Sequence, residues 1–133
     1  MSSCLVNPRA CHETELNYER APFKSRFAVV GAGPAGLSAA LVLAERGHEV
    51  DLYDAASEIG GQLNMAKVIP GKEEFHGLVD WFATELAEAG VDLRLGTAAA
   101  PEALAGFDET VVATGVLPRD PEIPGQDGPN VLS

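Results

Sequence analysis

The sequence contains three glycines at the spacing G-x-G-x-x-G, namely Gly31, Gly33 and Gly36. They follow the apolar run FAVV and precede a segment rich in alanine and leucine, which is the context of a strand, a tight turn and a helix. In that context the first glycine permits the turn, the second lets the backbone approach a pyrophosphate, and the third lets the helix pack on the strand. The free N–H groups of the first helical turn would point at the anion.

A carboxylate follows at the position expected of a ribose-binding acid. Asp54 ends the segment EVDLYD, 18 residues after Gly36. There it can accept a hydrogen bond from a ribose 2′-hydroxyl, and it would repel a 2′-phosphate. A glycine-rich turn beside a solvated aspartate is the alternative, but the loop, the acid and the strand–helix context agree. The sequence therefore predicts adenine-dinucleotide binding and disfavours NADP at this site, while the spacing leaves FAD and NAD undistinguished.

The elements that must position these residues alternate regularly along the chain. Short apolar runs predict strands at 27–31, 49–54, 91–96 and 109–115, and helical patterns lie at 35–47 and 101–107. The clearest helix precedes Gly90, and its predicted buried face carries Phe75, Leu78, Val79, Phe82 and Leu86. This alternation builds a parallel sheet with covering helices, so we predict one α/β domain over 26–133, preceded by an arm or linker over 1–25.

The charge of the chain excludes two classes of partner. Nine basic and 20 acidic side chains give a formal net charge of −11. A field of that sign repels nucleic acid and anionic membranes, so neither is expected as a partner. The stretch 27–44 carries no charge, but three glycines and Pro34 within it favour a strand, a turn and a helix over a membrane span. We expect a cytoplasmic protein with reduced cysteines.

Several longer stretches carry a family resemblance. The segments VVGAGPAGLSAALVLAERGHEVDLYDAASEIGGQL, VIPGKEEF and DETVVATGVLPR resemble the flavin domain of large NAD(P)H:flavin oxidoreductases. The leading CLVNPRACHETEL resembles the segment that joins the flavin barrel to that domain in bacterial 2,4-dienoyl-CoA reductases and in the iron–sulfur relatives of old yellow enzyme and trimethylamine dehydrogenase. The likeness covers nearly the whole chain and implies a Rossmann-like FAD-binding domain that is incomplete.

The resemblance implies roles for individual residues, beginning with the pyrophosphate loop and the ribose acid. Asp54 matches that acid, although many FAD domains have glutamate there, which reaches one methylene further. Lys72 matches a basic position near the cofactor, although an exposed lysine at a helix start is an equally good interpretation. The remaining matches are Gly31, Gly33, Pro34, Ala35 and Gly36 in the loop, Gly61 and Gln62 beside the ribityl chain, Ala99 beside the adenine, and Ala113, Thr114 and Gly115 in the turn that closes over the cofactor.

Cysteine chemistry is implied for one position only. Cys4 matches the last of four cysteines that hold a [4Fe–4S] cluster in the family, and the other three would lie before Met1. One thiolate cannot hold such a cluster, so this chain by itself is expected to carry none. Cys11 is expected to be an inert thiol, and together with His12 and Cys4 it gives too few ligands for a closed zinc site. His48 and His76 are interpreted as surface histidines.

The family also implies parts that this sequence does not contain. In the family, an FMN-bearing (β/α)₈ barrel reduces the substrate, and electrons pass from NADPH through FAD and the cluster to FMN. The barrel, a second dinucleotide domain for NAD(P)H and the final segment of the FAD domain are absent here. We therefore expect a fragment, natural or cloned, that binds a dinucleotide weakly without turnover. Two alternatives stay open: a structural module for ADP or NAD(H) without a redox role, and one component of a split oxidoreductase.

Overall fold

Four parallel strands form one sheet in the order β3-β2-β1-β4 in the computed structural model of the chain. The structure describes residues 4, 7, 9–117, 119–120 and 122–129. The predicted α/β alternation is confirmed. The elements in chain order are β1 (Arg26–Val30), α1 (Pro34–Glu45), β2 (Glu49–Tyr53), α2 (Leu63–Ala66), α3 (Glu74–Glu88), β3 (Asp92–Arg94), α4 (Pro101–Leu104) and β4 (Glu109–Val112).

Three differences separate these elements from the sequence-based expectation. The single-turn helix α2 lies in a stretch for which the sequence predicts neither a strand nor a helix, because one turn is too short to show a helical period. Strand β3 has three residues, although the apolar pattern extends over 91–96. Strand β4 stops at Val112, so Ala113, Thr114 and Gly115 form a turn beyond it.

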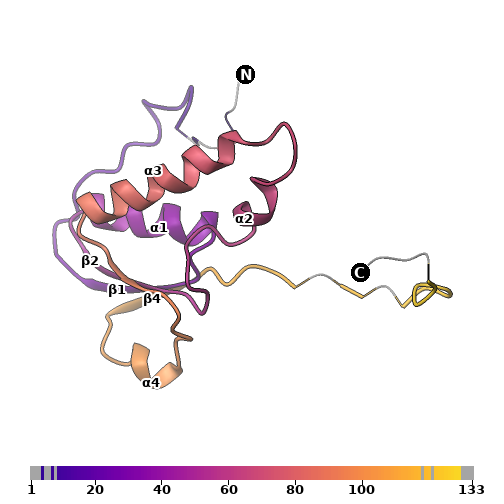
Figure 1. Cartoon of the computed structure of the whole chain (residues 1–133). Helices are drawn as coiled ribbons and strands as arrows, with labels where there is room; N and C mark the ends of the chain where they lie inside the picture. The colour runs from indigo at the N-terminus through magenta and orange to yellow at the C-terminus, as the bar shows by residue number, and fades with distance from the viewer. Residues whose placement is uncertain (1–3, 5–6, 8, 118, 121, 130–133) are drawn as a thin grey trace.

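The helices divide between the two faces of the sheet. Helices α1 and α3 cover one face and α4 lies against the other, so the chain crosses the sheet between β3 and β4 (Figure 1). Strand β1 pairs with β2 on one side and with β4 on the other, so the chain leaves β1 toward β2 and β3 on one side and returns to β4 on the other. The crevice between the carboxyl ends of β1 and β4 is therefore the topological switch point, where α/β sheets bind their ligands.

Aliphatic side chains that face α1 and α3 form the core. Val29 lies opposite Leu52 of β2 and Val111 of β4, and both Val29 and Leu52 are fully buried. From α3, Phe75, Phe82 and Leu86 are buried as predicted, whereas Leu78 and Val79 are only half-buried. Two of the five positions of the predicted helical face therefore lie at the margin of the core.

An aromatic pair and a hydrogen bond from the backbone to a carboxylate fix the α4 segment to the second face. The rings of Tyr53 and Phe107 meet edge to face with centroids 6.2 Å apart, and the Arg26 guanidinium lies 4.8 Å from the centre of the Phe107 ring. Next to Phe107, the Asp108 carboxylate accepts a hydrogen bond of 2.8 Å from the N–H of Arg26. These contacts hold the short connection that returns the chain to β4.

The uncharged stretch 27–44 divides into β1, a glycine turn and α1, as predicted. Gly31 makes the turn with a φ of +111°, a conformation that side-chain-bearing residues rarely adopt. In the part of the chain that the structure describes, no helix combines the length and the apolar character needed to cross a membrane.

The predicted arm contains turns and no regular element in its described part. It lies along the C-terminal end of α1, where the N–H of Ala21 donates to the Arg46 carbonyl at 2.9 Å and the Arg46 side chain donates to the Glu19 carbonyl. The tail after Gly115 extends away from the sheet, and the side chain of Leu117 is 93% exposed (Figure 1). Parts of the predicted arm, at 1–3, 5–6 and 8, and residues 118, 121 and 130–133 of the predicted domain lie outside the described residues.

Two basic residues lower the pKa of Glu49 at the amino end of the sheet. Lys24 Nζ lies 2.7 Å from one carboxylate oxygen of Glu49, and Arg26 Nε lies 3.4 Å from the other. The hydrogen bond and charge of Lys24 hold the pKa of Glu49 below its ordinary value of 4.5. A carboxyl with a lowered pKa in the folded state stabilises the fold above its unfolded pKa, and this contribution is lost as pH falls through the folded pKa.

Lys24→Met is therefore expected to raise the pKa of Glu49 toward 4.5. The part of the loss of folding stability in acid that comes from Glu49 should then become smaller. The effect on the free energy of unfolding should be small, because both side chains are more than half exposed and are screened by solvent. An NMR titration of the Glu49 carboxyl measures the pKa directly. An unchanged pKa in the variant would show that Lys24 does not perturb it in solution.

Candidate dinucleotide site

Two of the loop glycines are required by close packing within the chain. A Cβ at Gly31 would collide with the carbonyl oxygen of Ala113, and a Cβ at Gly36 would collide with the carbonyl oxygen of Gly31. The first turn of α1 thus rests directly on the loop, and the loop rests on the turn after β4. These contacts account for glycine at both positions without reference to a ligand.

Gly33 is different, because nothing in the described part of the chain requires a glycine there. Its φ of −77° and ψ of 178° are extended values that any residue adopts. A Cβ at this position would meet no heavy atom within 4 Å. The missing side chain therefore leaves open space above the backbone, and a group approaching from outside, such as a pyrophosphate, is what this space fits.

The start of α1 offers unpaired donors beside this space. The helix begins at Pro34, and its N-cap Gly33 provides no side-chain hydrogen bond. The first hydrogen bond of the helix runs from the N–H of Leu37 to the Gly33 carbonyl at 2.9 Å. The N–H groups of Ala35 and Gly36 therefore have no acceptor within the helix and can bind an anion, which the helix dipole also favours.

Asp54 lies where the sequence places it, at the end of β2, and its carboxylate is already engaged. One oxygen accepts a hydrogen bond of 2.5 Å from the N–H of Ala32, and the other accepts one of 2.8 Å from the N–H of Ala56. Each carboxylate oxygen has a second lone pair, so the half-buried side chain can still accept a ribose hydroxyl.

A pocket of about 310 Å³ adjoins Asp54 and brings several predicted residues together. Its size is at the lower end of the range for small-molecule sites and suits an adenosine. Gly31, Asp54, Ala99 and Thr114 of the predicted set line it. The other lining residues are Val30, Tyr53, Ala55, Thr97 and Ala98.

The second glycine pair packs against the first loop. The N–H of Gly60 donates to the Ala32 carbonyl at 2.8 Å, and a Cβ at Gly61 would lie 2.9 Å from the Cα of Gly33. Gly61 has a φ of +52°, and Gln62 is the exposed N-cap of α2. The loop EIGGQL is thus held beside the open space above Gly33, and its predicted role along the ribityl chain stays a prediction.

The turn after β4 closes the other side of the site. The N–H of Ala113 donates to the Val30 carbonyl at 2.8 Å, so hydrogen bonding between the β1 and β4 segments continues up to the start of the glycine loop. Thr114 is exposed and lines the pocket, and Gly115 turns the chain with a φ of +77°. Both loops at the switch point are therefore in contact.

Other predicted residues lie apart from this cluster. Lys72 is exposed on the turn before α3 and does not line the pocket. Cys4 and Cys11 are free exposed thiols, and within the described ranges no three His, Cys, Asp or Glu side chains converge as metal ligands. The thiolates that this chain offers do not fit a cluster with four cysteine ligands.

His48, which we expected on the surface, is half-buried. The Nδ1 atom of His48 accepts a hydrogen bond of 3.2 Å from the N–H of Ser25, and its ring meets that of Phe27 edge to face at 4.8 Å. These two contacts half-bury the His48 side chain and hold the segment that precedes β1. His76 is exposed.

Sequence reasoning identified Ala99 after β3 but missed its neighbours Thr97 and Ala98, and it also missed the residue between the first two glycines. The N–H of Thr97 donates to the Asp54 carbonyl at 2.8 Å, which places Thr97 and Ala98 on the pocket wall. Ala32 is fully buried and is held through both its N–H and its carbonyl. The run of small residues TAAA after β3 was the only available signal, and it has no specific pattern.

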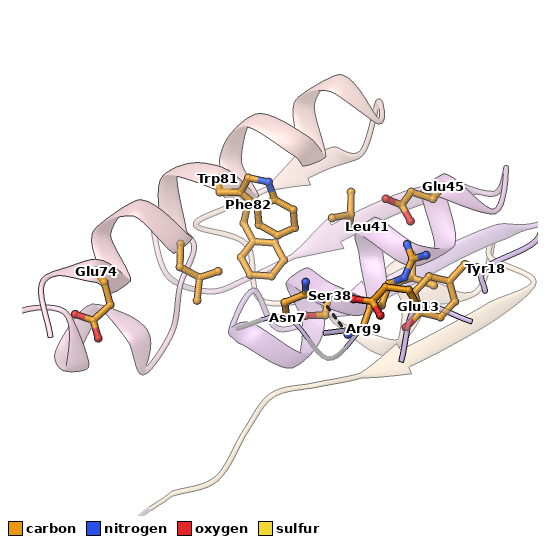
Figure 2. Close-up of a pocket in the computed structure, with 12 residues that line it drawn as sticks. Asn7, Arg9, Glu13, Tyr18, Ser38, Leu41, Glu45, Glu74, Trp81 and Phe82 are labelled. Carbon is orange, nitrogen blue, oxygen red and sulfur yellow. Dashed lines mark hydrogen bonds between the residues drawn. The ribbon is translucent and has the colours of Figure 1, made fainter. Parts of the chain in front are cut away.

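A larger groove of about 770 Å³ lies between the arm, α1 and α3 and contains none of the predicted site residues. Trp81 and Phe82 of α3 lie beside Leu41 of α1, and Arg9 and Glu13 of the arm lie below them (Figure 2). Among the residues that the structure describes, no glycine lines this groove. The chemistry of the smaller pocket therefore decides the assignment, despite its smaller volume.

Comparison with known proteins agrees with the geometry. Residues 25–132 match the family described as pyridine nucleotide-disulphide oxidoreductase. The chain is 42% identical to an NADH oxidase of Thermoanaerobacter brockii over 97% of its length, and 37% identical to a multifunctional alkene reductase/demethylase OYE of Caballeronia cordobensis over 95%. The solved structure of a 2-naphthoyl-CoA reductase complex matches 96% of the chain with a TM-score of 0.88 and 31% identity.

These matches cover only part of each relative. The chain spans 20% of the NADH oxidase, 19% of the alkene reductase and 20% of the 2-naphthoyl-CoA reductase. The similarity thus concerns one domain-sized region of much longer proteins.

Proposed function

This chain belongs to the pyridine nucleotide-disulphide oxidoreductase family, and from that membership we propose that it binds FAD through the ADP half of the cofactor. The observation that carries the proposal is the open space above Gly33, where the chain itself imposes no need for glycine. The unpaired N–H groups at the start of α1 border this space. The pocket beside Asp54 lies next to them along the same crevice.

Each part of the site has a proposed task. The N–H groups of Ala35 and Gly36 bind the pyrophosphate, with Gly33 allowing its close approach and Pro34 setting the first helical turn. Asp54 accepts a ribose hydroxyl, and Ala99 borders the adenine. For the flavin half we propose Gly61, Gln62 and Lys72, and for closure over the cofactor Ala113, Thr114 and Gly115.

The activity of the whole protein is a further step of the proposal. We propose an oxidoreductase that resembles NADPH-dependent 2,4-dienoyl-CoA reductase, in which this domain supplies the FAD site and Cys4 one cluster thiolate. When bound, FAD would supply the redox chemistry, and the residues of this chain hold its adenine end. The relay toward FMN that the resemblance implies needs a barrel, an NAD(P)H domain and three further cysteines outside this chain, so no electron-transfer step is assigned to its residues.

One observation favours a second candidate, a module that binds ADP or NAD(H) without redox chemistry. The pocket of about 310 Å³ has room for an adenosine, and it adjoins Asp54, the proposed ribose-binding residue. Such a module would use the same loop and the same acid, and would gain nothing from an isoalloxazine.

Calorimetric titration of the purified chain with FAD, ADP and NADH, alongside a visible spectrum, separates the two. We expect FAD to bind at least about tenfold more tightly than ADP, because contacts with the flavin half worth about 1.4 kcal/mol suffice for that ratio. Equal affinities for FAD and ADP would support the nucleotide module instead. A chain that keeps its fold and binds none of the three would overturn both proposals.

A further inference from the structure

Ala32, between the first two loop glycines, is held from two sides. It is fully buried, and its N–H donates to an Asp54 carboxylate oxygen at 2.5 Å. Its carbonyl accepts a hydrogen bond of 2.8 Å from the N–H of Gly60. The glycine loop is therefore tied to the end of β2 by one bond and to the second glycine loop by another.

The Asp54 carboxylate is itself fixed in place. Its second oxygen accepts the N–H of Ala56 two residues ahead, which closes an Asx turn. The main chain of Asp54 is held as well, since its N–H donates to the Arg94 carbonyl at 3.2 Å and its carbonyl accepts from Thr97 at 2.8 Å. A side chain whose orientation is set by the fold can orient a neighbouring loop before any ligand arrives.

We propose that Asp54 is a positioning residue for the pyrophosphate loop, in addition to its role toward the ribose. Its carboxylate holds the Ala32 N–H, and so keeps the stretch from Gly31 to Gly33 in the conformation that leaves the first turn of α1 open to an anion. This proposal rests on the proposed function, because it assumes that the loop binds the pyrophosphate. Without Asp54, the buried N–H of Ala32 would have no acceptor, and the loop would have to move to find one.

The two roles of Asp54 make different predictions for ligands that lack ribose hydroxyls. If Asp54 only binds the ribose, its substitution lowers the affinity for ADP and leaves the affinity for 2′,3′-dideoxy-ADP unchanged. If Asp54 positions the loop, its substitution lowers the affinity for both ligands, since both carry the pyrophosphate. Calorimetric titration of wild-type chain and Asp54→Ala with these two ligands distinguishes them.

We expect Asp54→Ala to weaken both ligands by roughly tenfold to a hundredfold, the range for losing a charge-assisted hydrogen bond. Asp54→Asn has nearly the same shape and should weaken both ligands less, which keeps the test informative if the alanine variant does not fold. Weakened binding of ADP with unchanged binding of 2′,3′-dideoxy-ADP would overturn the proposal.

A measurement on the ligand-free chain separates this proposal from the proposed function. The amide proton of Ala32 should exchange slowly with solvent in wild type and faster in Asp54→Ala, while the amide of Val29 within β1 keeps its exchange rate. This result can be obtained even if no nucleotide binds, so failure of the proposed function does not decide it. An unchanged exchange rate at Ala32 would overturn the positioning role.

Asp108→Ala is the matched control, because it removes the same kind of bond at the other end of β1. The Asp108 carboxylate accepts the N–H of Arg26 at 2.8 Å, far from the glycine loop. This variant should leave the affinities for both nucleotides and the exchange of the Ala32 amide unchanged. If it weakened both ligands as much as Asp54→Ala does, general destabilisation would explain the losses and the positioning role would be overturned.

Discussion

Gly36→Ala is expected to destabilise the fold of the chain strongly and to weaken its nucleotide binding. The added Cβ would collide with the Gly31 carbonyl oxygen, and it would lie 3.0 Å from the Gly31 carbonyl carbon and 3.4 Å from the Ala113 Cβ. Because most of these atoms are main chain, no change of rotamer relieves the clash, and α1 must move away from β1. We expect a loss of about 3 kcal/mol or more, the upper end of the range for overpacking, out of a typical total of roughly 5–15 kcal/mol.

Thermal unfolding followed by circular dichroism, together with titration with FAD, measures both effects. Gly77→Ala is the matched control, because Gly77 lies within α3 and a Cβ there meets nothing within 4 Å. This substitution should stabilise the chain by up to about 1 kcal/mol, since alanine is a better helix former than glycine. A Gly36→Ala protein with the melting temperature of wild type would show that α1 does not rest on the loop as described.

The glycine pattern correctly predicted a strand, a turn and a helix, but not what each glycine touches. A Cβ added at either Gly31 or Gly36 would meet Ala113, which follows the last strand. No rule of spacing connects residues so far apart in the sequence. Their proximity follows from the pairing of β4 beside β1, and the alternation of strands and helices predicts a parallel sheet without fixing the order of its strands.

Asp54 shows a similar limit at the level of one side chain. Its place after the second strand predicted a carboxylate near a ribose, and the structure does put it on the pocket wall. Its hydrogen bonds to Ala32 and Ala56 depend on how two loops fold against each other. Loop conformations of this kind carry no periodic signal, which is also why α2 and the wall residues Thr97 and Ala98 were not predicted.

Gly33→Ala is expected to separate ligand binding from folding, which Gly36→Ala cannot do. Gly33 has a backbone conformation open to any residue, and a Cβ there would meet no described heavy atom within 4 Å beyond its two neighbours in the chain. The melting temperature should therefore stay close to that of wild type. The new methyl group would occupy the space that we assign to the pyrophosphate, and FAD and ADP should both bind about a hundredfold more weakly, which corresponds to about 2.7 kcal/mol.

Titration with FAD and ADP, with thermal unfolding measured on the same sample, tests this expectation. Gly36→Ala serves as the comparison, because it should lower the stability and the affinity together. Wild-type affinity in Gly33→Ala would show that the pyrophosphate does not pass over Gly33, and the main support for the proposed function would be lost. Lost binding with a retained fold would mean that this glycine is present for the ligand alone. One loop would then contain two glycines that the fold requires, Gly31 and Gly36, and between them one that only the nucleotide requires.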